Sequence, residues 1–138
     1  SLVHLGLNQQ PERRDLRSAL AASSKEGRAV DIYIGVARLQ LGHNNVDRPE
    51  RLNGARYHAD WLDYPDESDG ASVQQIELKR LNAKLLLSTD DLAGYDLLKL
   101  AVVRQSDRNN SIAQLDSQYV PPLLNIAAWP ELRSQVLI

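Results

Sequence analysis

The chain has 138 residues, with 16 basic against 18 acidic side chains and a net charge of −2. A chain of this length forms one ordinary domain and can bury a core without disulfide or metal staples. Because basic and acidic side chains nearly balance, the chain lacks the excess of positive charge that is typical of a nucleic-acid-binding domain. Because cysteine is absent, disulfide frameworks and thiolate metal sites are excluded. No apolar run reaches the ~18 residues of a membrane span, and no signal peptide is visible.

Both ends of the sequence look like interior positions of a longer protein. The chain starts at Ser1 without an initiator methionine and ends at Ile138, inside an unfinished helical pattern. We therefore expect residues 1–138 to form a single β-rich domain excised from a longer protein. Pro130 then opens a helical region over residues 130–138.

The first elements are a strand and a helix. Residues 2–7 alternate enough for a strand. Residues 11–22 have helix composition, and Pro11 suits the first helical position, where its missing N–H costs nothing. Leu16 and Leu20 lie one turn apart and form a narrow apolar stripe. Gly27 is expected to close this segment.

Two extended segments follow. Residues 30–41 are apolar on both faces, which is typical of a strand inside a sheet. A turn signal at residues 42–45 ends it. Residues 48–53 are expected to form a loop, and residues 56–62 a second extended run that enters an acidic loop.

Residues 73–87 pose a choice between helix and strand. Their composition favours a helix, but the spacing of the apolar residues fits the two-residue period of a strand better than the period of a helix. The phase slips once, between Leu78 and Leu81, as a β-bulge would make it slip. Because periodicity is the stronger signal, the prediction is one bulged strand.

The remaining elements complete a β-rich pattern. A turn at residues 90–94 leads to a strand at 95–103, so the two long strands are expected to form a hairpin. A polar turn, a short strand at 112–116 and a last strand at 123–129 follow. At least six closely spaced strands predict a mainly β fold: an antiparallel sandwich or barrel-like shell with one or two short peripheral helices.

Two adjacent prolines mark the most informative stretch, residues 115–124. Pro121 and Pro122 have fixed φ and no N–H, and each pushes its predecessor into extended space. The stretch is therefore a stiff, extended rod that cannot be a helix interior or a central strand. It contains no nucleophile and no metal-ligand pair, so it indicates architecture. The candidate interface or domain-junction residues are Tyr119, Val120, Pro121, Pro122 and Trp129.

Residues suited to catalysis or metal binding are scattered. The three histidines, His4, His43 and His58, share no metal-ligand spacing, and surface positions explain them best. Asp90 and Asp91 are consecutive, so carboxylates that cap a turn are favoured over an acid/base pair. A solvated loop is favoured over a calcium site for the acidic cluster, which comprises Asp60, Asp63, Asp66, Glu67 and Asp69. No metal or cofactor is expected.

Aromatic residues are few, and phenylalanine is absent. Half or more of the large aromatics are expected to pack in the core. Tyr119 and Trp129 bracket the proline rod and could serve an interface instead. The basic residues Lys79, Arg80 and Lys84 lack clustered aromatics, so a solvated face is favoured over a nucleic-acid groove.

Three stretches, in their order and spacing, resemble the β-rich N-terminal region of the TssK (ImpJ/VasE) family of type VI secretion baseplate subunits. The first covers residues 30–39 with 45–46, and the second covers 55–57 with 73–87. The third covers 94–104 with 115–116 and 119–123. The family usually has Cys where this chain has Leu123, and the family's central helical bundle and C-terminal domain are absent from these residues.

The resemblance implies a non-enzymatic scaffold in the bacterial cytoplasm. Family members resemble phage-tail receptor-binding subunits, assemble as homotrimers and link the baseplate to the membrane complex. The β-rich part would face other baseplate subunits, and the regions missing here would reach the membrane complex. No nucleic-acid binding and no membrane insertion are implied.

Two other functions stay open. One is a phage-like carbohydrate- or receptor-binding β-domain that uses Trp61, Tyr64 and the acidic loop as a ligand platform. The other is a hydrolase fragment that uses Asp90, Asp91 or the acids of residues 60–70.

Overall fold

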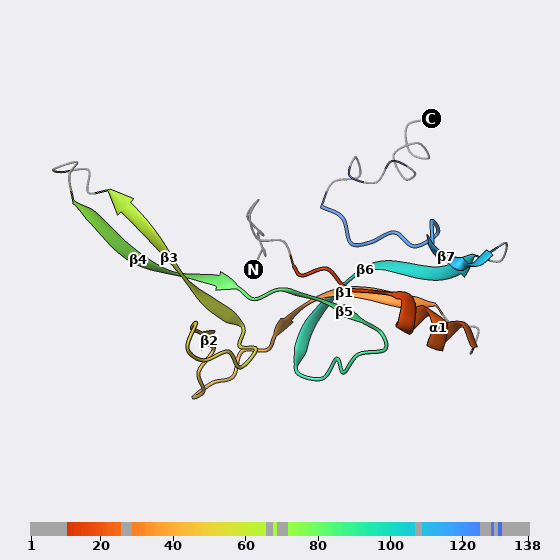
Figure 1. Cartoon of the computed structure of the whole chain (residues 1–138), viewed down its shortest axis with the longest axis horizontal. Coiled ribbons are helices and arrows are strands. Elements are labelled where there is room, and N and C mark those ends of the chain that lie inside the picture. The colour runs from red at the N-terminus through yellow and green to blue at the C-terminus, as the bar shows by residue number, and fades with distance from the viewer. Residues whose placement is uncertain are drawn as a thin grey trace. The chain divides into compact units, whose positions relative to one another are not determined.

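The structure is a computed structural model that describes residues 11–25, 29–65, 68, 72–106, 109–124, 128 and 130. These residues form a mainly β fold in which the strand pairs are antiparallel except for one short parallel pair (Figure 1). The predicted fold class is thereby confirmed. In chain order the elements are α1 (Arg17–Lys25), β1 (Val30–Ala37), β2 (Val46–Asp47), β3 (Tyr57–Pro65), β4 (Val73–Leu81), β5 (Lys84–Leu87), β6 (Tyr95–Ser106) and β7 (Asn109–Leu115).

The chain divides into two compact units. One, the hairpin unit, contains Val36–Ala83 and Gly94–Asp96. The other, the helix unit, contains Pro11–Gly35, Lys84–Ala93 and the chain from Leu97 onward. Each has its own sheet, with strand order β2-β3-β4 in the first and β5-β1-β6-β7 in the second.

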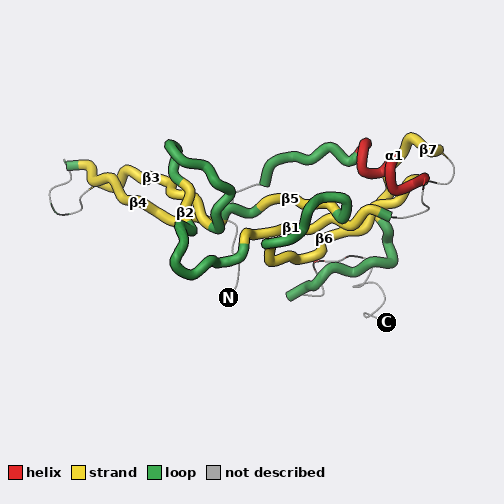
Figure 2. Tube along the Cα trace, turned by 90° about the horizontal axis from the view of Figure 1, so that it is seen from below, coloured by secondary structure: helices red, strands yellow, loops and turns green. Residues whose placement is uncertain are grey.

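The core of the helix unit lies where α1 packs on the four-stranded sheet. Its buried members come from the helix and three strands, and Val30 is fully buried. Figure 2 shows α1 at the end of this sheet where β7 also lies. Leu16 and Ile32 pack against the buried cluster as partly buried neighbours. The buried residues are Ala19, Leu20, Val30, Leu87 and Val103. Leu20 thus uses the apolar stripe that the sequence predicts, and the core is built from aliphatic side chains.

Helix α1 begins later than predicted. Pro11 is not in the first helical turn, because the helix starts at Arg17. The Asp15 carboxylate accepts a hydrogen bond from the Arg17 backbone N–H at 2.9 Å, and the first helical bond runs from Leu20 N to Leu16 O at 2.9 Å. An Asp that bonds forward to the backbone favours a helix start over a helix interior. Gly27 and residues 2–7 lie outside the described residues.

The strand predicted at residues 30–41 is shorter in the structure, and the extended run predicted at residues 56–62 begins and ends later than predicted. β1 ends at Ala37, and residues 38–45 lead through a turn at Gly42, whose φ is +77°. Asn45 fixes this loop, since its side chain accepts from Gln40 N and donates to Gln40 O. β3 continues to Pro65, beyond the predicted end.

The prediction of one bulged strand over residues 73–87 is wrong. The segment is extended, but β4 ends at Leu81 and β5 begins at Lys84. β4 pairs with β3 and β5 pairs with β1, so the two strands belong to different sheets. Asn82 marks the break: its backbone N–H donates to Arg56 O at 2.9 Å, and its side chain donates to Ala55 O at 3.1 Å.

The predicted hairpin around residues 90–94 is also wrong. β5 and β6 flank β1 on opposite sides and do not pair with each other. Hairpins form instead between β3 and β4 and between β6 and β7. Leu123 and Leu124 lie in no strand. The rest of the predicted last strand, residues 125–127 and 129, and most of the predicted helical region fall outside the described residues.

Gly35 is needed where β1 crosses the sheet. A Cβ at this position would lie 2.5 Å from Leu86 Cδ1 and 3.1 Å from Leu97 Cδ2. Both side chains belong to the flanking strands, β5 and β6. The absence of a side chain at Gly35 therefore leaves the space beside the central strand that these two leucine side chains occupy.

Candidate functional site

The stretch after β7, residues 116–124, is the candidate site, and we call it the junction segment. It opens with a turn organised by Asp116. Asp116 Oδ1 accepts from the Gln118 N–H at 3.0 Å and Oδ2 from Arg104 Nε at 3.0 Å. The Tyr119 N–H closes the turn on Asp116 O at 3.2 Å. The Gln118 N–H and then Arg104 stabilise the carboxylate, which lowers the pKa of Asp116.

Tyr119 fastens the junction segment to the sheet. Its hydroxyl donates to Lys99 O at 3.1 Å, and Lys99 Nζ lies 4.8 Å from the centre of its ring. The same ammonium pairs with Asp31 Oδ1 at 2.9 Å, while the Tyr33 hydroxyl donates to Asp31 Oδ2 at 3.1 Å. The hydrogen bond to Asp31 raises the pKa of Lys99. One lysine therefore links β6, β1 and the junction segment.

The proline rod alternates in exposure along its length. Tyr119, Pro121 and Leu123 are half-buried, whereas the residues between and after them face solvent. Val120 is 41% exposed and Leu124 is 91% exposed. Alternation with a period of two is the pattern that an extended chain gives, and it is the pattern expected of the predicted proline rod. Trp129 lies outside the described residues.

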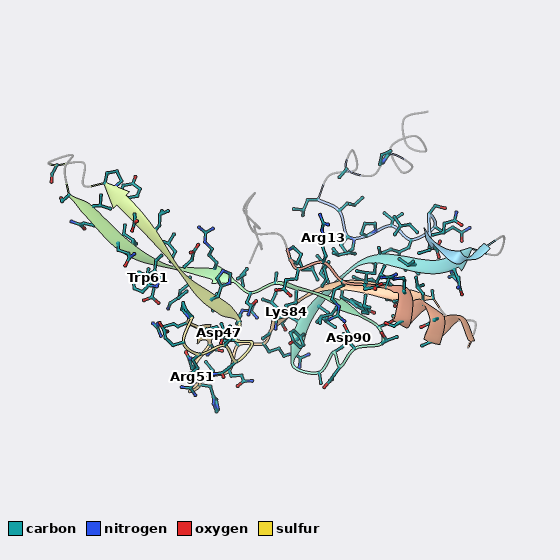
Figure 3. The ribbon with its side chains drawn as sticks, in the orientation of Figure 1. Arg13, Asp47, Arg51, Trp61, Lys84 and Asp90 are labelled. Carbon is teal, nitrogen blue, oxygen red and sulfur yellow. The ribbon has the colours of Figure 1, made fainter. Side chains whose placement is uncertain are left out.

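The aspartates after β5 act as turn caps, as predicted. Asp90 is labelled in Figure 3. Its Oδ2 accepts from the Leu87 N–H at 2.9 Å, and Arg14 Nη2 donates to both of its carboxylate oxygens at 2.8 Å. Asp91 Oδ1 accepts from the Ala93 N–H at 2.9 Å. Both carboxylates therefore serve the backbone of this turn.

The described acids and histidines of the hairpin unit lie in strands or turns, and two of the acids bind neighbouring side chains. Asp60 Oδ2 pairs with Arg80 Nε at 2.6 Å, and Asp63 accepts from the Gln75 amide at 3.3 Å. His58 lies in β3 and His43 in the turn before β2. Among the described residues, no group of three or more His, Asp or Glu side chains is close enough to hold a metal ion. His4, Asp66, Glu67 and Asp69 fall outside that part of the chain.

The exposed aromatics do not form a shared ligand platform. Trp61 and Tyr64 lie in β3 and are 47% and 48% exposed, so neither packs in the core. Their positions differ by an odd number of residues, which places them on opposite faces of the strand. This arrangement does not support the carbohydrate-platform hypothesis.

Asp47 is a structural carboxylate that sequence reasoning missed. It is 2% exposed, and it accepts from the Asn53 N–H at 2.9 Å and the Ala55 N–H at 2.8 Å (Figure 3). These bonds hold the loop that contains Gly54, whose φ is +71°. The Asn53-Gly54 pair signals the turn, but nothing in the sequence shows that Asp47 closes it.

In the part of the chain that the structure describes, no helix is long and apolar enough to cross a membrane.

Comparisons with known proteins agree on one family. Residues 4–137 match the family model described as bacterial type VI secretion, VC_A0110, EvfL, ImpJ, VasE. The type VI secretion system baseplate component TssK1 of Pseudomonas aeruginosa PAO1 is 31% identical over 105 residues, which is 75% of this chain and 23% of the relative. This chain therefore spans less than a quarter of the length of that relative.

Solved structures show the same fold. TssK in a TssK–TssF–TssG baseplate subcomplex, seen by cryo-electron microscopy, matches with a TM-score of 0.70 and 19% identity, over 91% of this chain and 40% of that one. A crystal structure of TssK matches with a TM-score of 0.63 and 22% identity, over 77% of this chain and 25% of that one. Because the family model spans almost the whole sequence, the chain belongs to the ImpJ/VasE family of type VI secretion proteins.

Proposed function

We propose that this chain is a non-enzymatic structural module of a type VI secretion baseplate, working in the bacterial cytoplasm by docking to other subunits. The observation that carries the proposal is the family match over residues 4–137. The use of its carboxylates supports it, because Asp31, Asp47, Asp90 and Asp116 each hold backbone or basic groups in place.

The proposed partners are other baseplate subunits. A matched structure contains TssK together with TssF and TssG, and another is a baseplate complex. In this proposal, the full-length protein is a homotrimer, and regions beyond this chain connect it to the membrane complex. It needs no cofactor, binds no nucleic acid and does not insert into a membrane.

The junction segment has a positional role in this proposal. Tyr119, Val120, Pro121 and Pro122, with Trp129 farther along, set the direction in which the chain leaves the sheet. The support is the contact of Tyr119 with Lys99, which fixes the start of a stiff segment.

A binding experiment with the full-length parent protein tests the proposed function. The parent protein, tagged and purified, is expected to retain TssF and TssG of the same bacterium in a pull-down. An unrelated tagged protein of similar size and charge is the control. Failure of the parent protein to retain either subunit would contradict the proposed function.

A further inference from the structure

The loop between β2 and β3 contains an asparagine followed by a glycine, Asn53 and Gly54. Asparagine is one of the chemically labile residue types, because the main-chain nitrogen of the next residue can attack its side-chain amide carbon and close a five-membered ring. A glycine in the following position has no Cβ to hinder this approach. The residue order in this loop therefore gives ring closure little steric resistance.

The structure leaves both reacting groups of this pair unbonded. Asn53 is exposed, and its side-chain amide has no hydrogen-bond partner among the described residues. The Gly54 N–H likewise has no partner in the described part of the chain, although the N–H groups on either side of it donate to Asp47. The attacking nitrogen and the attacked amide are thus free of bonds that would have to break first.

The other asparagines whose side chains the structure describes are held in place. The Asn45 amide nitrogen donates to two main-chain carbonyls, at 2.7 and 2.9 Å. Asn44 Oδ1 accepts from a main-chain N–H at 3.2 Å, and Asn82 Nδ2 donates to Ala55 O at 3.1 Å. Each of these three is followed by a residue with a Cβ. Within this described set, only Asn53 combines an unbonded amide with a following glycine.

We propose that Asn53 is a site of spontaneous covalent modification, at which the side-chain amide is converted to a carboxylate. In the first step the Gly54 nitrogen forms a bond to Asn53 Cγ, the bond from Cγ to Nδ2 breaks, and the proton of the Gly54 N–H leaves with Nδ2 as ammonia. In the second step one water molecule opens the cyclic imide. Cleavage at Cγ gives aspartate, whereas cleavage at the main-chain carbonyl carbon gives isoaspartate. The reaction consumes water alone and needs no oxidant.

The modification acts on the bonds that close the loop. Asp47 is buried and bridges the Asn53 and Ala55 N–H groups at 2.9 and 2.8 Å. Isoaspartate adds one carbon to the main chain between these two donors, which changes the spacing that the Asp47 carboxylate spans. Aspartate keeps the spacing but adds a carboxylate whose like charge opposes that of Asp47. We therefore expect the modified loop to open more readily.

Incubation of the full-length parent protein at mildly alkaline pH, where the attacking nitrogen loses its proton more readily, tests the proposal. Trypsin releases Asn53 in the peptide of residues 52–56 and Asn82 in the peptide of residues 81–84. Both peptides begin with Leu-Asn, so the second is the matched control. Mass spectrometry measures the conversion of amide to acid in each peptide, and enzymatic methylation specific for isoaspartate identifies that isomer. A parallel incubation in urea gives the rates in the unfolded chain.

We expect Asn53 to be converted at least about tenfold faster than Asn82 in the folded protein, since only Asn53 has an unbonded amide next to a glycine. The rate at Asn53 in the folded protein is expected to lie within about threefold of its rate in urea, because an exposed loop shields the amide little. A rate at Asn53 that falls to the rate at Asn82 on folding would overturn the proposal.

The effect on the loop is measured by hydrogen exchange of fresh and incubated protein. Faster exchange of residues 52–56 after incubation is expected, and equal exchange would overturn the proposed opening of the loop. Asn53→Gln is the control, because its longer side chain would have to close a six-membered ring while the main-chain N–H that Asp47 binds remains. Incubation is expected to leave exchange in this variant unchanged. The same acceleration in the variant as in the parent would assign the opening to a change elsewhere and would overturn the proposal.

Discussion

At the scale of single residues, five aspartates of this protein bind the backbone. Asp15, Asp47, Asp90, Asp91 and Asp116 all accept hydrogen bonds from main-chain N–H groups near them in sequence. Such bonds satisfy donors that turns and helix starts leave without partners. These five aspartates therefore stabilise the turns and the helix start at which elements begin or end.

The lowered pKa of Asp116 predicts that the stability of the folded protein depends on pH. Its pKa is lowered in the folded protein by the Gln118 N–H and by Arg104, whereas an unfolded chain has an Asp pKa of about 3.9. The folded state thus binds this proton less readily than the unfolded state. The resulting stability is fully present above the unfolded pKa and is lost as the pH falls through the folded pKa.

The measurement is urea unfolding of the parent chain and of Asp116→Asn between neutral and acidic pH. We expect the variant to be less stable at neutral pH and the difference to shrink in acid. Asp91→Asn, which removes another capping carboxylate, reports the general effect of losing a surface charge. A difference between parent and Asp116→Asn that stays constant down to strongly acidic pH would count against this role.

At the scale of elements, the junction segment depends on one side chain. Tyr119 donates to Lys99 O, and its ring receives the Lys99 ammonium group. Tyr119→Phe is expected to lower the free energy of unfolding by about 0.5–1.5 kcal/mol, because the Lys99 carbonyl loses its donor while the ring remains. Urea unfolding of the variant and the parent chain measures this difference.

A neighbouring position supplies the control for Tyr119. Val120 is 41% exposed, so Val120→Ala is expected to change the free energy of unfolding by less than about 0.5 kcal/mol. Equal losses for the two variants would show that the tyrosine hydroxyl contributes nothing specific.

The sequence predicted element types better than element partners. The alternation of apolar and polar residues located β1, β3 and β6 within a few residues, because this pattern depends only on the residues of the strand itself. The split between β4 and β5 was seen only as a phase slip near Leu81, because the cause lies in Asn82 and its bonds to Ala55 O and Arg56 O. Strand order was missed for the same reason: nothing in residues 84–103 indicates that β1 lies between β5 and β6.

The candidate site was predicted in part. The two prolines fix an extended backbone through local geometry, so the rod was foreseeable. The attachment of the rod to the sheet could not be foreseen, because it depends on Lys99, Asp31 and Tyr33, which come from two other strands. Surface positions for Trp61 and Tyr64 were foreseen only in the ligand-platform alternative, since composition alone favours burial of large aromatics when phenylalanine is absent.

At the scale of the whole molecule, stability is expected to be uneven between the two units. The buried aliphatic cluster belongs to the helix unit, whereas the far part of the β3–β4 hairpin is exposed. Regions with few buried apolar contacts open at lower free-energy cost. We expect amides of β3 beyond Ala59 to exchange at least about tenfold faster than those of β1.

Hydrogen exchange followed by mass spectrometry measures this contrast, with peptides from β1 and β3 compared in one sample. Equal protection of β1 and the far part of β3 in the isolated chain would contradict the uneven distribution.

The attachment of the junction segment has a mechanical consequence. Asp116 N binds Val102 O, and the Tyr119 hydroxyl binds Lys99 O, so two successive anchor points lie along β6. A pull on the chain beyond Leu124 would pass through two prolines that have little freedom to stretch. The tension would therefore reach the Tyr119 anchor before the Asp116 anchor. Of these two hydrogen-bonded anchors, the one that the Tyr119 hydroxyl makes would therefore bear such a load first.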